Sequence, residues 1–233
     1  MALHAILTEG LGYSRYGTHG TGLGAYVNGW LAYEHPEAVV GFFGHDLGMV
    51  PLQDLNAPGA RPLDAEEQAH YARSADWAKR EGAYAELQRT KPQALGQALN
   101  DSPTGLLGWL VEKHRMWSDC DGDVERRYTR DELVTQAMVY WVSGNVAAPL
   151  RAYLERVRFD PPLVPGRPLG VPSGVAITRY QPTNPPRALP RQLAERTHDL
   201  RQWTELPRGG HFASWEEPEL VAAAIREFYR PLR

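Results

Sequence analysis

The sequence predicts an α/β protein in which a mostly parallel sheet is interrupted by a long helical insert. Residues 1–50 have a strand, glycine-rich turn, helix and strand in succession. Residues 51–165 have the spacing and caps of helices, and residues 166–233 return to strands followed by a helix. Strands that alternate with helices are typical of a parallel α/β sheet. We therefore expect a core built from 1–50 and 166–233, with 51–165 as a helical domain.

The first fifty residues are expected to form a βαβ unit. Ala2 to Leu11 predicts a short helix that glycines close. A brief strand near 15–19 leads into Gly20-Thr-Gly22-Leu-Gly24, and a helix follows from 25 to 33. The β-branched and aromatic run at 38–44 lies between turn residues, which predicts a buried parallel strand.

The middle of the chain is expected to be helical. Asp64-Ala-Glu-Glu67 and Thr129-Arg-Asp-Glu132 have the capping-box pattern, in which side chains satisfy free backbone N–H groups at a helix start. Apolar residues after each box recur at helical spacing. Prolines between 161 and 168 predict a rigid hinge where the insert ends.

The last segment is expected to complete the sheet. Strands are predicted near 172–178 and 200–206, and Arg208-Gly-Gly-His211 forms a loop after the second of them. Pro218 suits the first turn of a final helix with one apolar face. With the two earlier strands, this predicts four parallel strands.

Composition and charge exclude several function classes. The 233 residues include 25 Lys and Arg against 28 Asp and Glu, a formal net charge of −3, so no nucleic-acid partner is expected. A single cysteine, Cys120, excludes an internal disulfide and suits a reducing compartment. No secretory signal is recognisable and no stretch is apolar enough to cross a membrane, so we expect a cytoplasmic protein without a membrane partner.

Neither a metal site nor a cofactor site is expected. Asp119-Cys-Asp121-Gly-Asp123 superficially resembles a calcium loop. Its glycine stands fourth instead of sixth, and Arg130 stands where the twelfth-position Glu belongs. A solvated acidic turn explains the pattern better.

The turn Gly20-Thr-Gly22-Leu-Gly24 has three interpretations. A phosphate-binding loop would have the spacing G-x-G-x-x-G, which is not present. A nucleophile elbow has small residues on both sides of a central side chain that the turn exposes, but Gly22 has no side chain. The third interpretation is a plain structural turn.

Motifs spread over nearly the whole chain point to one family. They are Leu99-Asn-Asp-Ser-Pro-Thr-Gly-Leu-Leu-Gly-Trp109, Val111-Glu-Lys113, Tyr140-Trp-Val-Ser-Gly144, Val171-Pro-Ser-Gly-Val-Ala176 and Pro207-Arg-Gly-Gly-His-Phe-Ala213, with Glu216-Glu-Pro-Glu-Leu220 after it. Together they resemble the microsomal-type epoxide hydrolases. The resemblance implies an α/β-hydrolase fold with a helical cap. It also implies that an elbow Asp forms an ester with the epoxide, that a His-activated water hydrolyses the ester, and that two cap tyrosines bind the epoxide oxygen.

By this resemblance His211 is the water-activating base, and Tyr84 and Tyr153 are the two cap tyrosines. We expect both hydroxyls and the His211 ring to face a common cavity. Two positions differ from the family pattern, because Gly22 replaces the elbow Asp and the acid position after the seventh family strand falls on Gln181.

One residue is a candidate replacement for the missing acid. Asp46 follows the expected strand at 38–44, where some relatives in the superfamily carry their carboxylate. The chain also begins where the second half of the family's core begins, without the His-Gly-x-Pro oxyanion loop. We therefore expect the strand edge near 16–19 to associate with a second copy or with a complementing N-terminal polypeptide.

Three functions remain open on the sequence. The first is hydrolysis of a small-molecule epoxide to a diol, in a chain whose covalent nucleophile is missing. The second uses Tyr84, Tyr153 and His211 for direct hydrolysis or for an epoxide-opening cyclisation. The third is a non-catalytic paralogue, a pseudoenzyme that binds a ligand or a partner.

Overall fold

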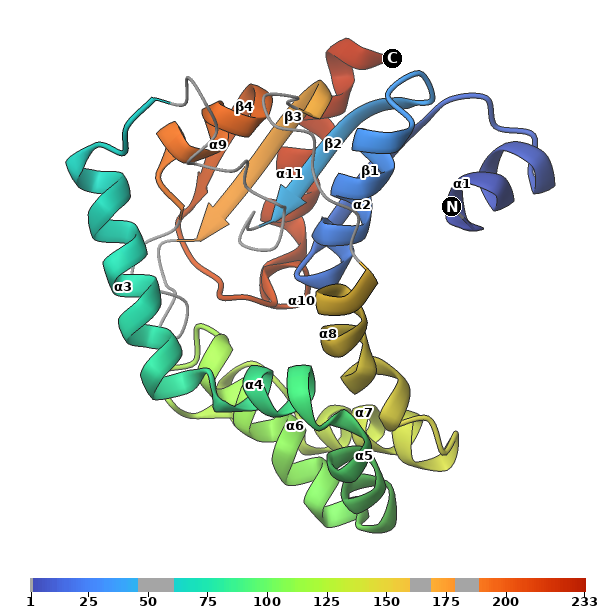
Figure 1. The fold of residues 1–233 in the computed structure, drawn as a ribbon, viewed down its shortest axis with the longest axis vertical. Coiled ribbons are helices and arrows are strands. Elements are labelled where there is room, and N and C mark those ends of the chain that lie inside the picture. The colour runs from blue at the N-terminus through green and yellow to red at the C-terminus, as the bar shows by residue number, and fades with distance from the viewer. Residues whose placement is uncertain (1, 46–60, 160–168, 179–188) are drawn as a thin grey trace. The chain divides into compact units, whose positions relative to one another are not determined.

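The computed structural model describes residues 2–45, 61–159, 169–178 and 189–233, and in these ranges it contains one four-stranded parallel sheet (Figure 1). The strands follow one another in space as they do in sequence, in the order β1-β2-β3-β4. Each overlaps one of the four predicted strands, so the fold class is confirmed. Their bounds are Tyr16–Thr21 for β1, Val39–His45 for β2, Leu169–Thr178 for β3 and His198–Leu206 for β4.

Helices form most of the rest of the described chain. In the segment predicted as a helical insert, the described residues form helices and no strand. The α-helices are α1 (Ala2–Ala5), α2 (Leu23–Glu34), α3 (Ala65–Glu81), α4 (Ala83–Thr90), α5 (Pro92–Asp101), α6 (Pro103–Trp117), α7 (Arg130–Val142), α8 (Ala147–Phe159), α9 (Arg191–Thr197), α10 (Ala213–Glu216) and α11 (Pro218–Tyr229). A π-helix, η1 (Ile6–Gly10), and two 3₁₀ turns, η2 (Val124–Arg126) and η3 (Arg230–Leu232), complete them. No helix in the described ranges has the length and apolar composition to span a bilayer.

The sheet buries a hydrophobic layer on each face. Phe42 and Phe43 are consecutive in β2 and fully buried, and because side chains alternate along a strand they belong to opposite layers. Phe42 packs in a cluster with residues of α2 and α9, and Phe43 packs with residues of α10 and α11. Figure 1 shows α2 and α11 on opposite faces of the strands.

The chain divides into two compact units, each with its own core. The sheet unit comprises Met1–Tyr71, Leu163–Gln181 and Pro186–Arg233, and the helical unit comprises Ala72–Pro162 and Pro182–Pro185. In the helical unit, apolar residues of α5 to α8 form one cluster around Leu99, Leu106, Ala137, Val146 and Leu150. The cap boundaries expected at 51 and 165 lie outside the described residues and stay predictions.

Both predicted capping boxes are present. At Thr129, the hydroxyl accepts the Glu132 N–H at 3.2 Å and the Glu132 carboxylate accepts the Thr129 N–H at 2.7 Å. At Asp64, the carboxylate accepts the Glu67 N–H at 2.9 Å, and the Glu67 carboxylate accepts the Asp64 N–H at 2.8 Å. Two side chains therefore satisfy backbone donors at the start of each helix.

Glu67 does more than cap α3, because its side chain is fully buried and ion-paired. Arg196 donates from Nε to Oε1 at 2.7 Å and from Nη2 to Oε2 at 2.6 Å, which is a two-point contact with the carboxylate. Arg61 donates to Oε1 at 2.7 Å. The hydrogen bonds from Arg196 outweigh the effect of burial and lower the pKa of Glu67 to about 2. The pair connects α3 with α9 inside the sheet unit.

Candidate active site

A sharp turn joins β1 to α2 at the carboxyl edge of the sheet. Gly22 caps α2 and has φ 51° and ψ −123°, a positive φ that residues with a Cβ rarely adopt. Strand, one-residue turn and helix follow in direct succession, as they do in a nucleophile elbow. The geometry favours the elbow interpretation of this turn over a phosphate loop.

Gly20 explains why the turn can be so tight. A Cβ at position 20 would lie 2.5 Å from the carbonyl carbon of Gly24 and 2.7 Å from the backbone nitrogen of Ala25. These are backbone atoms that cannot move aside, so the end of β1 and the start of α2 approach this closely only because position 20 lacks a side chain.

The turn faces the imidazole of His211. A Cβ placed on Gly22 would lie 3.3 Å from Nε2 and 3.5 Å from Cε1 of that ring. The loop after β4 therefore brings His211 opposite the position that a nucleophile would occupy on an elbow. The structure brings together Gly22 and His211, which lie 189 positions apart in the chain.

Two acidic residues hold the loop that carries His211. The Gly210 N–H donates to both carboxylate oxygens of Glu216, each at 3.1 Å, and Arg208 forms an ion pair with Glu217 at 2.8 Å. The hydroxyl of Thr21 lies 3.4 Å from the carbonyl oxygen of His211. Sequence reasoning gave no role to Glu216 or Glu217, although both stand in a motif that carries the family resemblance.

The carboxyl ends of the other strands lie along the same edge. Thr21 is paired in register with His45, and His45 with Ala176 of β3. His45 ends β2 and its side chain is fully buried. In open α/β sheets, ligands bind outside the carboxyl ends of the strands. Asp46 and Gln181, the residues considered for the acid position, lie outside the described residues.

The helical unit brings Tyr84 and Tyr153 together. Tyr84 is in α4 and Tyr153 in α8, and their rings meet edge to face with centroids 6.2 Å apart. Each phenol contributes to the pKa shift of the other, and Gln88, one turn after Tyr84, also acts on the pKa of Tyr153. Burial is the largest cause that raises the pKa of both phenols, followed for Tyr84 by the neighbouring Tyr153. Both hydroxyls therefore keep their protons well above neutral pH and remain able to donate.

A lysine and a tryptophan contact the ring of Tyr84. Lys113 Nζ lies 5.0 Å from the ring centroid of Tyr84 and 5.0 Å from that of Trp109, within the range of cation–π attraction. The Trp117 ring lies 5.1 Å from the Tyr84 ring. Only 12 % of the Lys113 side chain is exposed, so its position over the phenol is fixed by packing. Lys113 ends the Val111-Glu-Lys113 motif, which carries the family resemblance but does not by itself indicate this contact.

His211 beside the elbow and the two phenols of the helical unit each suit acid–base chemistry. Imidazole can take a proton from water or from a hydroxyl near neutral pH, and a protonated phenol can donate a hydrogen bond to an oxygen that gains charge. Among the described residues, the group of His and acidic side chains that lie close enough to share a metal ion is elsewhere, at His4, His35 and Glu37. That group is therefore separate from the turn at Gly22.

Curated relatives share sequence with most of the chain. A Stigmatella aurantiaca protein provisionally named epoxide hydrolase is 34% identical over 233 residues, covering 98% of this chain and 50% of its own length. Epoxide hydrolase 1 of Sus scrofa is 36% identical over 162 residues, which cover 64% of this chain and 34% of that protein. The chain thus spans half or less of the length of these relatives. No protein-family model matches the sequence.

Solved structures share the fold. The epoxide hydrolase of Aspergillus niger superposes with a TM-score of 0.75 at 22% identity, covering 100% of this chain and 56% of that one. The juvenile hormone epoxide hydrolase of Bombyx mori superposes with a TM-score of 0.75 at 24% identity, covering 99% of this chain and 59% of that one. With the sequence relatives, these neighbours confirm the resemblance found in the motifs. The chain is therefore similar in sequence to epoxide hydrolases and has the α/β-hydrolase fold.

Proposed function

We propose that the protein binds a small epoxide and opens it to a diol without an ester intermediate. Similarity to epoxide hydrolases supports an epoxide as the substrate. The direct route is proposed because Gly22 has no side chain that could form an ester bond. His211 then acts on the water that attacks the epoxide carbon.

The distance between Gly22 and His211 carries this proposal. An ideal Cβ built on Gly22 would lie 3.3 Å from Nε2 of His211, so the ring of the base faces this backbone position at close range. Because Gly22 has no side chain, we propose that a water held by His211 takes the place of the nucleophile's side chain. A general base must be within such reach of the proton that it removes.

The proposed step balances in one displacement. The water oxygen forms a bond to one epoxide carbon, and the bond between that carbon and the ring oxygen breaks. The water gives one proton to Nε2 of His211, and the ring oxygen takes a proton from a tyrosine hydroxyl. Tyr84 and Tyr153 are proposed as the donors, because their raised pKa values keep them protonated and their rings already lie edge to face.

A single-turnover experiment in water enriched in heavy oxygen tests the route. With the protein in excess over an aryl epoxide, direct attack puts the label into the diol of the first turnover. An ester route would deliver an unlabelled oxygen from the protein in that turnover. We expect a labelled first-turnover diol and loss of most of the rate in His211→Ala, while His19→Ala, an exposed histidine of β1, serves as the matched control.

Three results of the same experiment would contradict the proposal. An unlabelled diol or an isolable ester adduct would show that another residue acts as a covalent nucleophile. Full activity in His211→Ala would remove the proposed base. A labelled cyclic ether formed from a hydroxy-epoxide, without diol, would favour the cyclisation instead.

A non-catalytic role is the second candidate, and the same glycine favours it. Removal of one triad member lowers hydrolytic rates by about 10⁴–10⁶-fold in well-studied enzymes. If epoxide binding is detected by calorimetry but no diol forms in the single-turnover experiment, the protein is a binding protein.

We also propose that β1 associates with another polypeptide, a second copy or a complementing one. β1 is an edge strand of the described sheet, and an edge presents N–H and C=O groups that can pair with another strand. Sedimentation of the purified chain at micromolar concentration should show a species larger than the monomer. A stable monomer whose β1 amides are protected from hydrogen exchange would contradict this expectation.

A further inference from the structure

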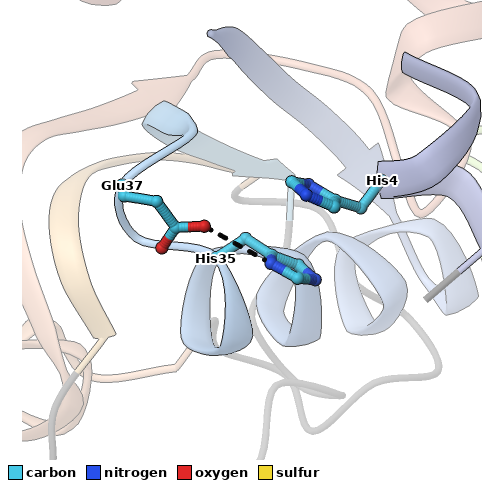
Figure 2. Close-up of side chains that lie close together, drawn as sticks. All are labelled: His4, His35 and Glu37. Carbon is cyan, nitrogen blue, oxygen red and sulfur yellow. Dashed lines mark ion pairs between the residues drawn. The ribbon is translucent and has the colours of Figure 1, made fainter. Parts of the chain in front are cut away.

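We propose that His4, His35 and Glu37 form a binding site for a divalent transition-metal ion such as Zn²⁺. One donor atom of each residue lies within 4.8 Å of the donor atoms of the other two. His4 comes from α1, His35 ends α2 and Glu37 lies in the turn before β2 (Figure 2). The site belongs to the sheet unit and does not depend on the proposed function.

His4 is held in an orientation that suits a metal ligand. Its Nδ1 is hydrogen-bonded to the hydroxyl of Tyr16 at 2.9 Å, which leaves Nε2 as the nitrogen available to an ion. Histidines that bind metals commonly hold their second ring nitrogen in a hydrogen bond of this kind, which fixes the ring and its tautomer. Tyr16 would therefore act as the outer partner of this ligand.

His35 lies directly against both of the other ligands. Its ring is stacked on that of His4, with centroids 3.6 Å apart and an angle of 3° between the planes. Its Nδ1 lies 3.5 Å from Oε1 of Glu37, as the dashed line in Figure 2 shows. Its Nε2 is buried and has no hydrogen-bond partner among the described residues. An inaccessible ring nitrogen without a partner is the kind of group that an ion can satisfy.

The donor set selects the class of ion. Two imidazoles and one carboxylate occur together around catalytic Zn²⁺, whereas Ca²⁺ and Mg²⁺ prefer oxygen ligands alone. Bonds of about 2.1 Å in tetrahedral geometry place the donors about 3.4 Å apart. The donors here lie within 4.8 Å of one another, so binding would require turns of the side chains that open the stacked pair.

One part of the site is rigid and the other part is not. The carbonyl of His35 accepts hydrogen bonds from the N–H groups of Ala38 at 3.1 Å and Val39 at 3.0 Å, so the end of α2 and the start of β2 are fixed to each other. By contrast, no residue of α1 or η1 is buried. An ion bound to His4 and His35 would thus fasten an otherwise lightly packed N-terminal helix to the sheet unit.

Calorimetric titration of the full chain with ZnCl₂ at pH 7.5 tests the site, with protein that carries no histidine tag. We expect one ion per chain. His4→Ala and His35→Ala should each weaken binding by tenfold or more, because each removes a ligand. Glu37→Gln should also weaken binding by tenfold or more, because it removes the charged ligand. Tyr16→Phe should weaken it about tenfold, as loss of an outer partner does in metal sites. His19→Ala should leave the affinity unchanged.

Hydrogen exchange supplies a second measurement on the same proteins. Bound Zn²⁺ should slow exchange of the amides of α1 and η1, and His4→Ala should abolish the slowing. Absence of Zn²⁺ binding, or equal binding by wild type, His4→Ala and His35→Ala, would overturn the proposal. Equally tight binding of Mg²⁺ would also overturn it, because a site of this donor set discriminates against Mg²⁺.

Discussion

The sheet unit and the helical unit match the epoxide hydrolase pattern to different degrees. The sheet unit has the strand–turn–helix backbone of an elbow and a histidine that faces it, but no nucleophile at Gly22. The helical unit holds Tyr84 against Tyr153, the two tyrosines that the resemblance implies, and Lys113 makes a cation–π contact with the Tyr84 ring.

The difference shows that backbone geometry and reactive chemistry are separate properties of a site. The turn at Gly22 is set by the close approach at Gly20 and by the pairing of β1, neither of which involves a side chain at position 22. The tyrosine pair depends on side chains throughout, since the two rings meet edge to face and burial raises the pKa of both phenols. Loss of one side chain therefore changes the chemistry of the sheet unit and leaves its shape.

The variant with the largest expected effect tests whether the helical unit supplies the proton donors. If Tyr84 and Tyr153 donate to the epoxide oxygen, the double variant Tyr84→Phe, Tyr153→Phe should lower the rate of epoxide opening by about 10²–10⁴-fold, the usual range for general acid catalysis. Phenylalanine keeps the aromatic packing, so folding should be little affected. Tyr140→Phe, a partly exposed tyrosine of the same unit, is the control. Equal rates in both variants would remove the tyrosines from the mechanism.

The two capping boxes allow a direct comparison of stability between the units. Glu67→Gln removes the charge from a buried carboxylate that two arginines contact, and we expect it to lower the free energy of unfolding by about 3 kcal/mol. Glu132→Gln in the helical unit alters a box whose hydrogen bonds are exposed, and its effect should be clearly smaller. Urea denaturation of both variants measures the difference. Equal effects would mean that the arginines add nothing to the cap.

The pH dependence of the same variant gives the sign of the Glu67 contribution. The folded-state pKa of about 2 is below the ordinary value of 4.5, so the carboxylate stabilises the folded state fully above about pH 4.5. This contribution is lost as the pH falls toward 2. Wild type and Glu67→Gln should therefore converge in stability between pH 4.5 and 2, whereas a constant difference would show that the charge is not involved.

Gly22→Asp tests whether the elbow needs only its side chain. A residue with a Cβ at φ 51° is strained, which should cost about 1–3 kcal/mol of stability. We expect the variant to remain well below the activity of a full epoxide hydrolase, because Gln181 stands at the usual acid position and the added side chain begins only 3.3 Å from His211. Gly22→Asn carries the same strain without a carboxylate. Unlabelled first-turnover diol from the Asp variant alone would show that the ester route has returned.

The smallest expected effect concerns pH. Because burial raises the pKa of Tyr84 and Tyr153, both phenols stay protonated past the ordinary value of 10. The rate of epoxide opening should therefore show no loss from tyrosine ionisation up to pH 10, as a pH–rate profile would reveal. A decline with a midpoint near 9 that Tyr84→Phe eliminates would contradict the raised pKa.

Local sequence patterns predicted the elements of the fold because the forces behind them are local. The β-branched run at 38–44 and the caps at Asp64 and Thr129 involve neighbours within four positions. The contact between Glu67 and Arg196 joins residues 129 positions apart, and no pattern in either segment signals it. The same holds for Lys113 over Tyr84, since packing of two helices decides that contact.

The candidate site was predictable only through the resemblance. His211, Tyr84 and Tyr153 stand in ordinary-looking segments, and composition alone would make them a loop histidine and two core aromatics. The structure places Gly22 opposite His211 and Tyr84 against Tyr153, each pair within one unit. The expected common cavity for these groups stays a prediction, as do Asp46 and Gln181.

The contact of Gly20 with the first turn of α2 has an evolutionary consequence. Any larger residue at position 20 would push α2 away from β1, so selection for a folded protein preserves the elbow even when position 22 has no catalytic duty. A single nucleotide change converts any glycine codon into a codon for aspartate or for glutamate. A later mutation of Gly22 could therefore place a carboxylate opposite His211 in a turn that already has the elbow backbone.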